Sequence, residues 1–348
     1  MSRGVKFAIG IAISLVAIWL AMKDVRPAEV WSALRQANYV GFVAAMALTV
    51  FGFWVRAVRW RWLFSGRKVT LDSLFSATMI GFMANNLLPL RLGEFVRAWA
   101  LGRSEQMSKT TVLATVVVER VVDMITLLGI FGFTLLVHPL SESTEAGRLA
   151  HAGAGILLGA CIGLTVFVVA IESSPALTAK FVAFLTSMFP ERVRARTAKT
   201  LEHFLAGLGL FRDLPRLLWV FVLSFAMFGI FALVLTVSMW AFGLQVPWYG
   251  GLVMLVITAI GIMVPAAPGY IGTLNLACVA GLALFGIEKQ LSVSFSWFYW
   301  ASQWLPISVV GMWYLRREGL SLKSLGEASD SGGGIPSKEP AKSGERTA

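Results

Sequence analysis

The sequence has few of the residues with which soluble enzymes do chemistry. Of its 348 residues only 14% are charged, 3 are His and 2 are Cys, whereas 57% are hydrophobic and the mean hydropathy is +0.74. Such a composition is too apolar for a soluble domain and predicts a polytopic membrane protein. The cysteines lie in apolar runs and the histidines are scattered, so we expect neither a disulfide nor a metal site.

Motifs of several enzyme classes are also missing. We find no nucleophile elbow, no phosphate-binding glycine loop and no dinucleotide fingerprint, and we expect no catalytic residue and no cofactor. The net charge of +11 would suit nucleic acid. In so apolar a chain it is more typical of cytoplasmic loops that face anionic lipid. We therefore expect membrane lipids with anionic or phosphate headgroups as partners and no nucleic acid, and leave open a homo-oligomer or a membrane partner.

Long apolar runs predict an all-α fold of six spanning helices plus two re-entrant, broken helix pairs. The expected spans are 5–22, 40–63, 110–137, 149–171, 215–242 and 292–315, and the broken pairs are 71–88 with 90–102 and 248–265 with 268–286. As a helix, residues 71–88 would extend for ~27 Å, nearly the thickness of a bilayer. A bundle of ten crossing segments is therefore the alternative.

The polar segments complete the predicted topology. We expect 23–37 to form a loop, 175–213 to form amphipathic helices on the cytoplasmic surface, and 318–348 to be a disordered cytoplasmic tail behind a membrane domain at 1–317. With both termini in the cytoplasm, most Lys and Arg fall on the inner side. This agreement with the positive-inside rule predicts a multi-pass protein of the cytoplasmic membrane.

Aromatic and basic residues are typical of helix ends at the membrane surface. Arg56, Arg59 and Trp60 close the second apolar run and predict its exit on the cytoplasmic side. Four tryptophans of the last span are expected to form an interfacial belt or to pack between helices, namely Trp297, Trp300, Trp304 and Trp313.

Two stretches of the sequence resemble each other. Residues 78–83 read TMIGFM and residues 258–263 read TAIGIM, and each is followed by a Pro-x-x-x-Gly motif. In the predicted topology the two broken pairs enter the membrane from opposite sides. We therefore predict an inverted repeat with halves at about 40–137 and 215–315, the arrangement with which transporters build substrate sites at the midplane.

A polar stripe runs along the predicted span 110–137. Thr111, Thr115, Glu119 and Asp123 recur every four residues, and Glu119 lies ~15 Å from the helix start, near the bilayer centre. Ionisable groups at that depth are costly unless they are paired or wetted. The candidate partners of these carboxylates are Arg91, Arg97 and Arg120. The cluster is either an ion-pair staple between helices or a site that stays open to a charged headgroup.

The second break, at 264–273, carries no charge. A helix beginning near Gly269 would aim unpaired backbone N–H groups at the midplane, which suits a phosphate or carboxylate. A proline-kinked helix without a ligand is the alternative. The expected substrate-binding residues come from both breaks and the polar stripe: Asn85, Asn86, Arg91, Glu94, Arg97, Glu119, Arg120, Asp123, Pro268, Gly269, Gly272, Thr273 and Asn275.

At these residues the sequence resembles the lysylphosphatidylglycerol synthase transmembrane-region family, also called the flippase-like domain family. The resemblance covers about 5–318 and rests on three motifs: Asn86-x-x-Pro-x-Arg-x-Gly-Glu-x-x-Arg97, Glu119-Arg120-x-x-Asp123 and Pro265-x-x-Pro-Gly-x-x-Gly272. Some members carry an aminoacyl-transferring domain after the membrane region and move the aminoacylated lipid across the bilayer. This sequence ends after the membrane region, so the resemblance implies a stand-alone lipid translocase-like protein.

We therefore expect a flippase or transporter of a phosphate-bearing lipid. The phosphate would meet Arg91 or Arg97, and Glu119, Asp123 or Glu94 would meet a cationic group or a coupling proton. One alternative is a structural or regulatory membrane partner that docks through its basic surface helices. The other is a lipid-modifying enzyme, which the lack of a general base beside a nucleophile disfavours. The sequence does not identify the lipid, the direction or the energy source.

Overall fold

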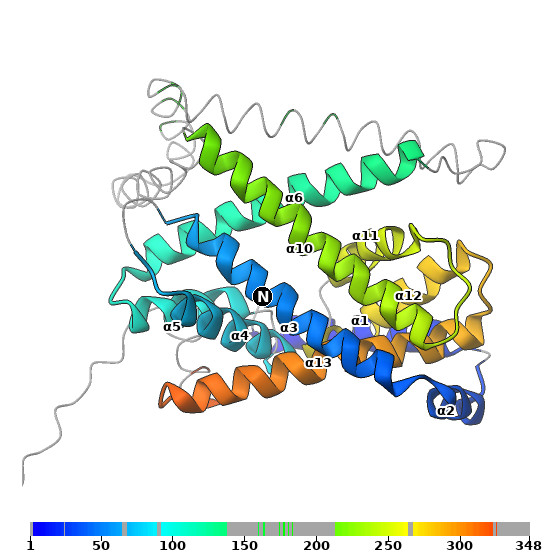
Figure 1. Cartoon of the computed structure of the whole chain (residues 1–348). Helices are drawn as coiled ribbons and strands as arrows, with labels where there is room; N and C mark the ends of the chain where they lie inside the picture. The colour runs from blue at the N-terminus through cyan, green and yellow to red at the C-terminus, as the bar shows by residue number, and fades with distance from the viewer. Residues whose placement is uncertain are drawn as a thin grey trace, which may run out of the picture.

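The computed structural model is all helical in the part of the chain that it describes (Figure 1). That part is 3–23, 25–64, 68–88, 92–137, 213–263, 267–322, Leu325 and isolated positions between 159 and 183. Its helices are α1 (Arg3–Met22), α2 (Pro27–Gln36), α3 (Tyr39–Arg61), α4 (Leu71–Leu87), α5 (Gly93–Ser104), α6 (Lys109–Val137), α10 (Leu214–Ala241), α11 (Gly250–Met263), the 3-10 turn η3 (Pro268–Tyr270), α12 (Thr273–Ala283) and α13 (Lys289–Arg317).

Most predicted segments coincide with these helices to within a few residues. The first broken pair is α4 and α5, and the second is α11 and α12. Two predicted segments, the span 149–171 and the amphipathic helices 175–213, lie almost wholly outside the described residues. Among the described helices, α3 and α10 are long and apolar enough to cross a membrane by length and composition. The count of six spans stays a prediction.

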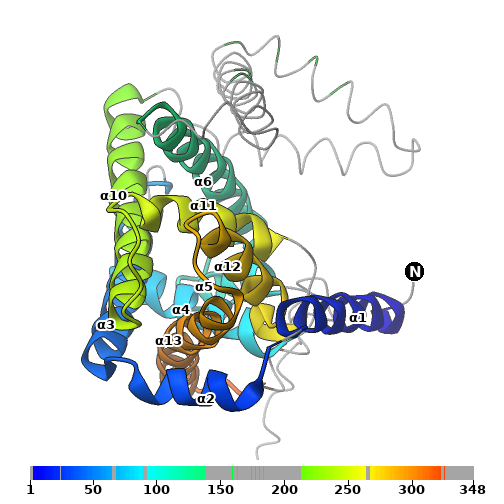
Figure 2. The same ribbon diagram turned by 90° about the vertical axis from the view of Figure 1, so that its right-hand side faces the viewer.

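Helix α2 occupies the stretch 23–37 that we predicted to be a loop, so that prediction is wrong. Pro27 lies in its first turn, where a missing N–H costs nothing, and Glu29 is in the same turn. Val30 is buried. The short helix packs against α13 and runs along one end of the molecule (Figure 2). A single buried side chain is too weak a periodic signal to distinguish such a helix from a polar loop.

Helices α3 and α10 lie side by side through the middle of the molecule (Figure 1). Small residues let them approach closely: a Cβ atom on Gly41 would lie 2.4 Å from the Cβ of Ala241. Interfaces of this kind are common between membrane helices, where packing rather than the hydrophobic effect drives association. The first helix of each broken pair packs against this helix pair: α4 contacts α3, and α11 contacts α10.

The two broken pairs are built alike. In the first pair a Cβ on Gly81 would lie 2.8 Å from both the carbonyl oxygen of Gly93 and the Cβ of Arg97. In the second pair a Cβ on Gly261 would lie 3.1 Å from the carbonyl oxygen of Thr273 and 2.4 Å from the Cβ of Ala277. Gly81 and Gly261, the matching glycines of the two TxIGxM stretches, thus make equivalent contacts. Gly81 faces residues 93 and 97, Gly261 faces residues 273 and 277, and the separations along the chain are the same in both pairs.

The helix contacts also match between the two halves. Helix α4 packs against α13 while α11 packs against α6, and α5 packs against α6 while α12 packs against α13. Exchanging α3, α4, α5 and α6 for α10, α11, α12 and α13 reproduces this pattern. Eight of the described helices therefore pack as two interlocked sets of four, in which the first helix of each broken pair contacts the last helix of the other set.

Helix α3 begins directly after Asn38, whose side-chain oxygen accepts hydrogen bonds from the N–H groups of Val40 and Gly41 at 3.0 and 3.4 Å. We expect Asn38→Ala to lower the free energy of unfolding by about 1 kcal/mol, because these N–H groups lose their acceptor. Thermal unfolding followed by circular dichroism in detergent measures this change. Asn38→Ser keeps an oxygen in reach and is the control. Equal midpoints for the two variants would contradict a capping role.

The first residues of the predicted tail belong to the folded structure. Leu320 and Leu325 are 7% and 0% exposed and lie in an apolar cluster with residues of α4 and α5. The hydroxyl of Ser76 donates a hydrogen bond to the carboxylate of Glu318. The tail beyond Leu325 lies outside the described residues, and the start of the predicted disordered segment at Glu318 is therefore wrong by several residues.

Candidate functional site

Two acids of α6 and three arginines meet between the helices in what we call the buried network: Arg56, Arg59, Arg97, Glu119 and Asp123. The carboxylate of Glu119 lies 3.1 Å from Arg56, 3.2 Å from Arg59 and 2.8 Å from Arg97. The carboxylate of Asp123 lies 3.1 Å from Arg56 and 2.6 Å from Arg59. None of the five side chains is more than 6% exposed.

Local helix geometry explains why these groups meet. Arg56 and Arg59 are three residues apart on α3, and Glu119 and Asp123 are four apart on α6, so each pair projects from one helix face. The forked guanidinium groups then bridge both carboxylates. Arg97 reaches the same place from α5.

Further contacts hold the arginines of the network in place. The guanidinium of Arg97 lies 3.5 Å from the ring centre of Trp60, and the indole N–H of Trp60 donates to the hydroxyl of Thr115 at 2.9 Å. Arg59 also donates to the hydroxyl of Ser224 on α10 at 2.9 Å. The network therefore connects α3, α5, α6 and α10, and Arg59 and Arg97 each have a partner besides the acids.

The network gives one group of residues a role that the sequence did not predict. Arg56, Arg59 and Trp60, which were predicted to mark the exit of a helix at the membrane surface, are 5%, 0% and 0% exposed and lie between the helices. Helix α3 ends directly after them, at Arg61, and its exit on the cytoplasmic side stays a prediction. Arg97 is a partner of Glu119, as expected. The signal that would have found the missing arginines is their spacing of three residues, which matches the opposite charges four residues apart on 110–137.

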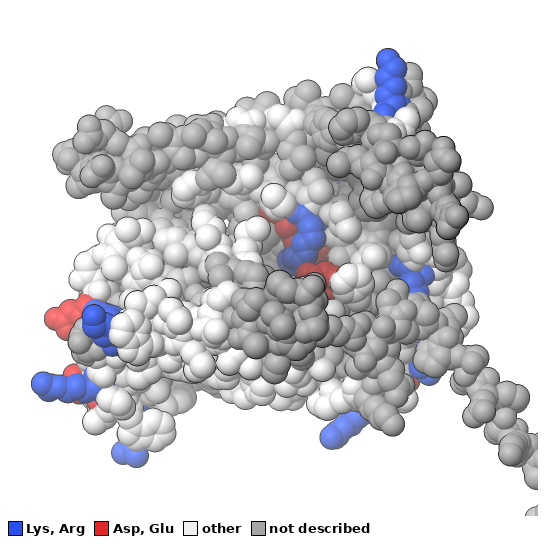
Figure 3. Space-filling model, turned by 180° about the vertical axis from the view of Figure 1, so that it is seen from behind, with Lys and Arg blue, Asp and Glu red and all other residues white. Residues whose placement is uncertain are grey.

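Arg120 was a candidate partner of the two carboxylates of α6, and it lies 3.7 Å from one of them, Asp123. Its shorter contact, at 2.8 Å, is with Glu94 on α5. Its side chain is 41% exposed and that of Glu94 is 32% exposed. Seen from behind, charged side chains of both signs lie together in a hollow of an otherwise largely uncharged face (Figure 3). The Arg120–Glu94 pair thus brings the edge of the network to the molecular surface.

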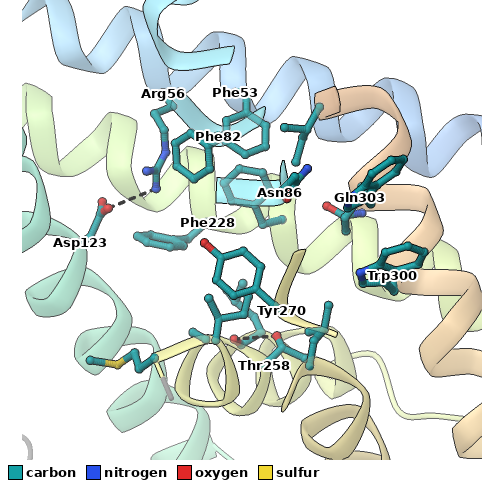
Figure 4. A pocket seen from close by; sticks show the side chains of 18 of the residues that line it. Phe53, Arg56, Phe82, Asn86, Asp123, Phe228, Thr258, Tyr270, Trp300 and Gln303 are labelled. Atoms are coloured by element: carbon teal, nitrogen blue, oxygen red, sulfur yellow. Dashed lines mark hydrogen bonds and ion pairs between the residues drawn. The ribbon is translucent and has the colours of Figure 1, made fainter. Parts of the chain in front are cut away.

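A cavity of about 360 Å³ adjoins the network at the place where the two broken pairs meet. Helix α4 contacts η3 there, and a Cβ on Gly269 would lie 3.5 Å from the carbonyl oxygen of Asn86. One end of the cavity carries Arg56, Arg120 and Asp123. Figure 4 shows the Arg56–Asp123 pair at one end, Asn86, Gln303 and Trp300 at the other, and Tyr270 between them.

The structure divides the predicted site residues into three groups. Asn86, Arg120, Asp123 and Gly269 line the cavity. Arg97 and Glu119 lie behind it in the buried network, and Glu94 lies beside Arg120. The others are Asn85, Pro268, Gly272, Thr273 and Asn275, which shape the two breaks, and Arg91, which lies outside the described residues.

Two of the predicted site asparagines, Asn85 and Asn275, bind backbone N–H groups where a helix begins. The side-chain oxygen of Asn85 accepts the N–H of Gly93 at 2.8 Å, where α5 begins. The side-chain oxygen of Asn275 accepts the N–H of Gly272 at 3.0 Å, where α12 begins, and its amide donates to Ser296 at 2.9 Å. Each broken pair thus uses an asparagine to satisfy the backbone at the start of its second helix.

The second break differs from the predicted helix start near Gly269. A 3-10 turn occupies 268–270, and α12 begins only at Thr273. Gly269 and Gly272 have φ of +72° and +91°, values that glycine adopts without strain, and Tyr270 has φ of +60°. The N–H of Ala267 donates to the hydroxyl of Ser14 at 2.7 Å. Several backbone groups of this break are therefore already used within the protein, and the helix that was expected to begin near Gly269 begins four residues later.

Side chains that we had not assigned to a site line much of the cavity. The indole N–H of Trp300 donates to the carbonyl oxygen of Gly269 at 2.8 Å, and the ring of Trp300 stacks on that of Trp304 with centres 5.6 Å apart. These two tryptophans were predicted to form a belt or to pack between helices, but both line the cavity, as do Tyr270 and Gln303. Tryptophans spaced three to four residues apart give no sequence signal that separates these roles.

The cavity combines a cationic end, aromatic walls and neutral amides. Arginines in this setting bind carboxylate or phosphate groups through paired hydrogen bonds. Aromatic walls suit apolar or ring-shaped groups, and the amides of Asn86 and Gln303 pair with hydroxyl or carbonyl groups. Within the described ranges, no group of three or more His, Cys, Asp and Glu residues is placed to hold a metal ion.

Comparison with known proteins gives three matches. The family model described as "Lysylphosphatidylglycerol synthase TM region" matches residues 7–311. A UPF0104 membrane protein of Methanothermobacter thermautotrophicus is 25% identical over 310 residues, which cover 83% of this chain and 88% of that protein. The glycosyltransferase AglD of Haloferax volcanii is 28% identical over 138 residues, which cover 39% of this chain but only 22% of that protein.

Proposed function

Because the chain belongs to the lysylphosphatidylglycerol synthase transmembrane-region family, a family of membrane proteins, we propose that it moves a phosphate-bearing lipid across the cytoplasmic membrane. The observation that carries this proposal is the cavity between the two broken pairs, one end of which is formed by arginines of a buried charge network. Both termini lie in the cytoplasm in this proposal, as the distribution of Lys and Arg favours.

The matched construction of the two helix sets supports the proposal. Equivalent glycines at 81 and 261 make equivalent contacts, and the packing partners exchange between the sets. This is the relation expected of an inverted repeat, with halves at about 40–137 and 215–315. In transporters, such repeats place the substrate where the broken helices meet.

The position of Arg120 along α6 indicates how deep in the membrane the site would lie. Arg120 lies ~16 Å from the start of α6 at Lys109, close to the middle of a helix of 29 residues. Exposed charge at mid-membrane depth is rare and is a sign of a substrate path. Met124 and Met263, which also line the cavity, are 45% and 65% exposed. A headgroup would enter sideways between α6 and α11 while its acyl chains stay in lipid.

Arg120 allows a test of the proposal. Its ion pair with Glu94 is half exposed and contributes little to stability, so Arg120→Gln is expected to fold. We expect this variant to slow lipid exchange by about tenfold or more, because an arginine–phosphate contact in a shielded site is worth more than ~1.4 kcal/mol. The assay measures headgroup accessibility in proteoliposomes for labelled glycerophospholipids and a glycosylated polyprenyl phosphate, which is included because one relative is a glycosyltransferase.

The matched control is Arg35→Gln. Arg35 lies on α2 with its guanidinium 5.1 Å from the ring centre of Trp31, away from the residues that line the cavity. This variant should exchange lipid at the wild-type rate. If folded wild-type protein accelerates none of the lipids, the translocase proposal is wrong. Docking to a partner would then be tested by capture through the basic stretch at 192–212.

A further inference from the structure

We propose that Tyr270 binds the phosphate of the transported lipid together with Arg120, by donating a hydrogen bond from its phenolic hydroxyl to a phosphate oxygen. This inference deepens the proposed function and rests on it. Tyr270 was not among the residues that the sequence predicted to bind substrate, and it belongs to η3, in the break between α11 and α12. The second broken pair thus contributes a polar side chain to the site in addition to its backbone turn.

The backbone of Tyr270 is the first argument. Its φ is +60°, in the left-handed region where a residue with a Cβ atom is disfavoured. Gly269 and Gly272 in the same break also have positive φ, and glycine would adopt the conformation of residue 270 with less strain. Strained residues of this kind persist where the surrounding structure imposes them, and they cluster at ligand-binding sites. A tyrosine here therefore indicates a role for its side chain that the turn itself does not require.

Hydrogen bonds from neighbouring helices hold the turn around Tyr270. The indole N–H of Trp300 on α13 donates to the carbonyl oxygen of Gly269 at 2.8 Å. The N–H of Gly272 donates to the side-chain oxygen of Asn275 on α12 at 3.0 Å. The backbone on both sides of Tyr270 is therefore bonded to side chains of α12 and α13, which sets the direction in which the phenol leaves the turn. A binding residue needs a supported position of this kind.

The position of the side chain is the second argument. The phenol of Tyr270 projects from η3 into the cavity, and Figure 4 shows its hydroxyl directed toward the end that carries Arg56 and Asp123. Arg120 lines the same end, and Tyr270 lies close enough to interact with its charge. Arg120 comes from α6, in the first helix set, whereas Tyr270 comes from the break of the second set. A phosphate at this end therefore contacts side chains of both sets.

The chemistry of a phenol is the third argument. Arg56 and Arg120, the arginines at this end of the cavity, are paired with carboxylates, so a phosphate that binds them competes with these acids. A phenolic hydroxyl is neutral and donates a hydrogen bond to an anion without needing a counter-charge. Hydrogen bonds to a charged acceptor are about twice as strong as those between neutral groups. The hydroxyl of Tyr270 therefore adds affinity for phosphate at a place where the arginines are shared with acids.

The variant Tyr270→Phe keeps the ring and its packing and removes only the hydroxyl. We expect it to slow exchange of every labelled lipid that wild-type protein accelerates by about tenfold, because all of them share the phosphate and a hydrogen bond to a charged group is lost. Tyr39→Phe is the control, because the hydroxyl of Tyr39 donates to the carbonyl oxygen of Leu34 at 2.9 Å, outside the cavity. Exchange by Tyr270→Phe at the rate of Tyr39→Phe overturns the inference, since a packing role needs the ring alone.

A binding measurement separates failure of this inference from failure of the proposed function. Short-chain phosphatidylglycerol and diacylglycerol, which lacks the phosphate, are titrated into purified full-length protein, and thermal stabilisation is recorded. Binding of phosphatidylglycerol that is about tenfold weaker in Tyr270→Phe, with binding of diacylglycerol unchanged, supports the inference even if no lipid is exchanged, in which case only the translocase proposal fails. Equal binding of phosphatidylglycerol by wild-type protein and Tyr270→Phe, or no preference of wild-type protein for it over diacylglycerol, overturns the inference, and the exchange assay then decides the translocase proposal alone.

Discussion

Glu119→Gln is expected to destabilise the folded protein by about 3–5 kcal/mol, the usual cost of removing one partner from a buried charge pair. The substitution leaves Arg97 without its carboxylate and leaves Arg56 and Arg59 to share Asp123. Three buried guanidinium groups would then face one acid. Unfolding by sodium dodecyl sulfate, followed by circular dichroism in mixed micelles, measures the change.

Two companion variants make this prediction specific. Adding Arg97→Gln restores the original balance of charge within the network, so the double variant should be more stable than Glu119→Gln alone. Glu94→Gln breaks the half-exposed pair with Arg120 and should cost at most about 1 kcal/mol. If Glu119→Gln cost no more than Glu94→Gln, the buried network would not hold the helices together.

Gly93→Ala is expected to lower stability by about 3 kcal/mol and to disturb the network from a distance. A Cβ at this position would lie 2.3 Å from the carbonyl oxygen of Gly81 and 2.5 Å from the side-chain oxygen of Asn85. Backbone atoms cannot move aside locally, so α4 and α5 must separate. Because Arg97 is one turn further along α5, its contact with Glu119 would be weakened at the same time. The same unfolding assay, together with the lipid-exchange assay, records both effects.

Matched glycine variants separate close packing from a general effect of alanine. Gly229 of α10 has no atom within 4 Å of its added Cβ, so Gly229→Ala should leave stability unchanged or raise it slightly. Gly261 is the equivalent of Gly81, the glycine that faces Gly93 across the first pair, and Gly261→Ala should be destabilising, because its Cβ would meet that of Ala277 at 2.4 Å. Tolerance of Gly261→Ala alongside loss in Gly81→Ala, whose Cβ would lie 2.8 Å from that of Arg97, would contradict a shared construction of the two pairs.

Sequence reasoning predicted the helices well where apolar length and proline determine them. The helix predicted at 71–88 is α4 at Leu71–Leu87, and the one predicted at 110–137 is α6 at Lys109–Val137. The breaks also fall where expected, because proline and glycine interrupt the helical hydrogen bonds there. The short helix α2 was missed because its pattern is too brief, and its position depends on packing against α13.

The site was predicted in part. Spacing on a single helix identified Glu119, Arg120 and Asp123, since groups four residues apart share a face. It did not identify Arg56 and Arg59, because basic residues beside tryptophans near the end of an apolar run have the same composition as a surface anchor. Which of the two roles they take is decided by acids more than sixty residues later in the chain. The cavity was not predicted for the same reason: its lining residues come from helices far apart in the sequence, and a pattern within one segment cannot show that they meet.

That separation has a consequence for how the protein is made. Arg56 precedes Asp123 by 67 residues and Arg59 precedes it by 64, so the ribosome delivers α3 to the membrane well before its partners on α6 exist. In the proposed topology, an arginine that lacks its acid partner opposes insertion of its helix into hydrocarbon, and the two arginines lie in the last turns of α3. We therefore expect the end of α3 that carries them to stay near the lipid headgroups during synthesis, with its arginines hydrated. In the proposed topology the arrival of α6 neutralises them, so we expect the final placement of these two helices to be coupled.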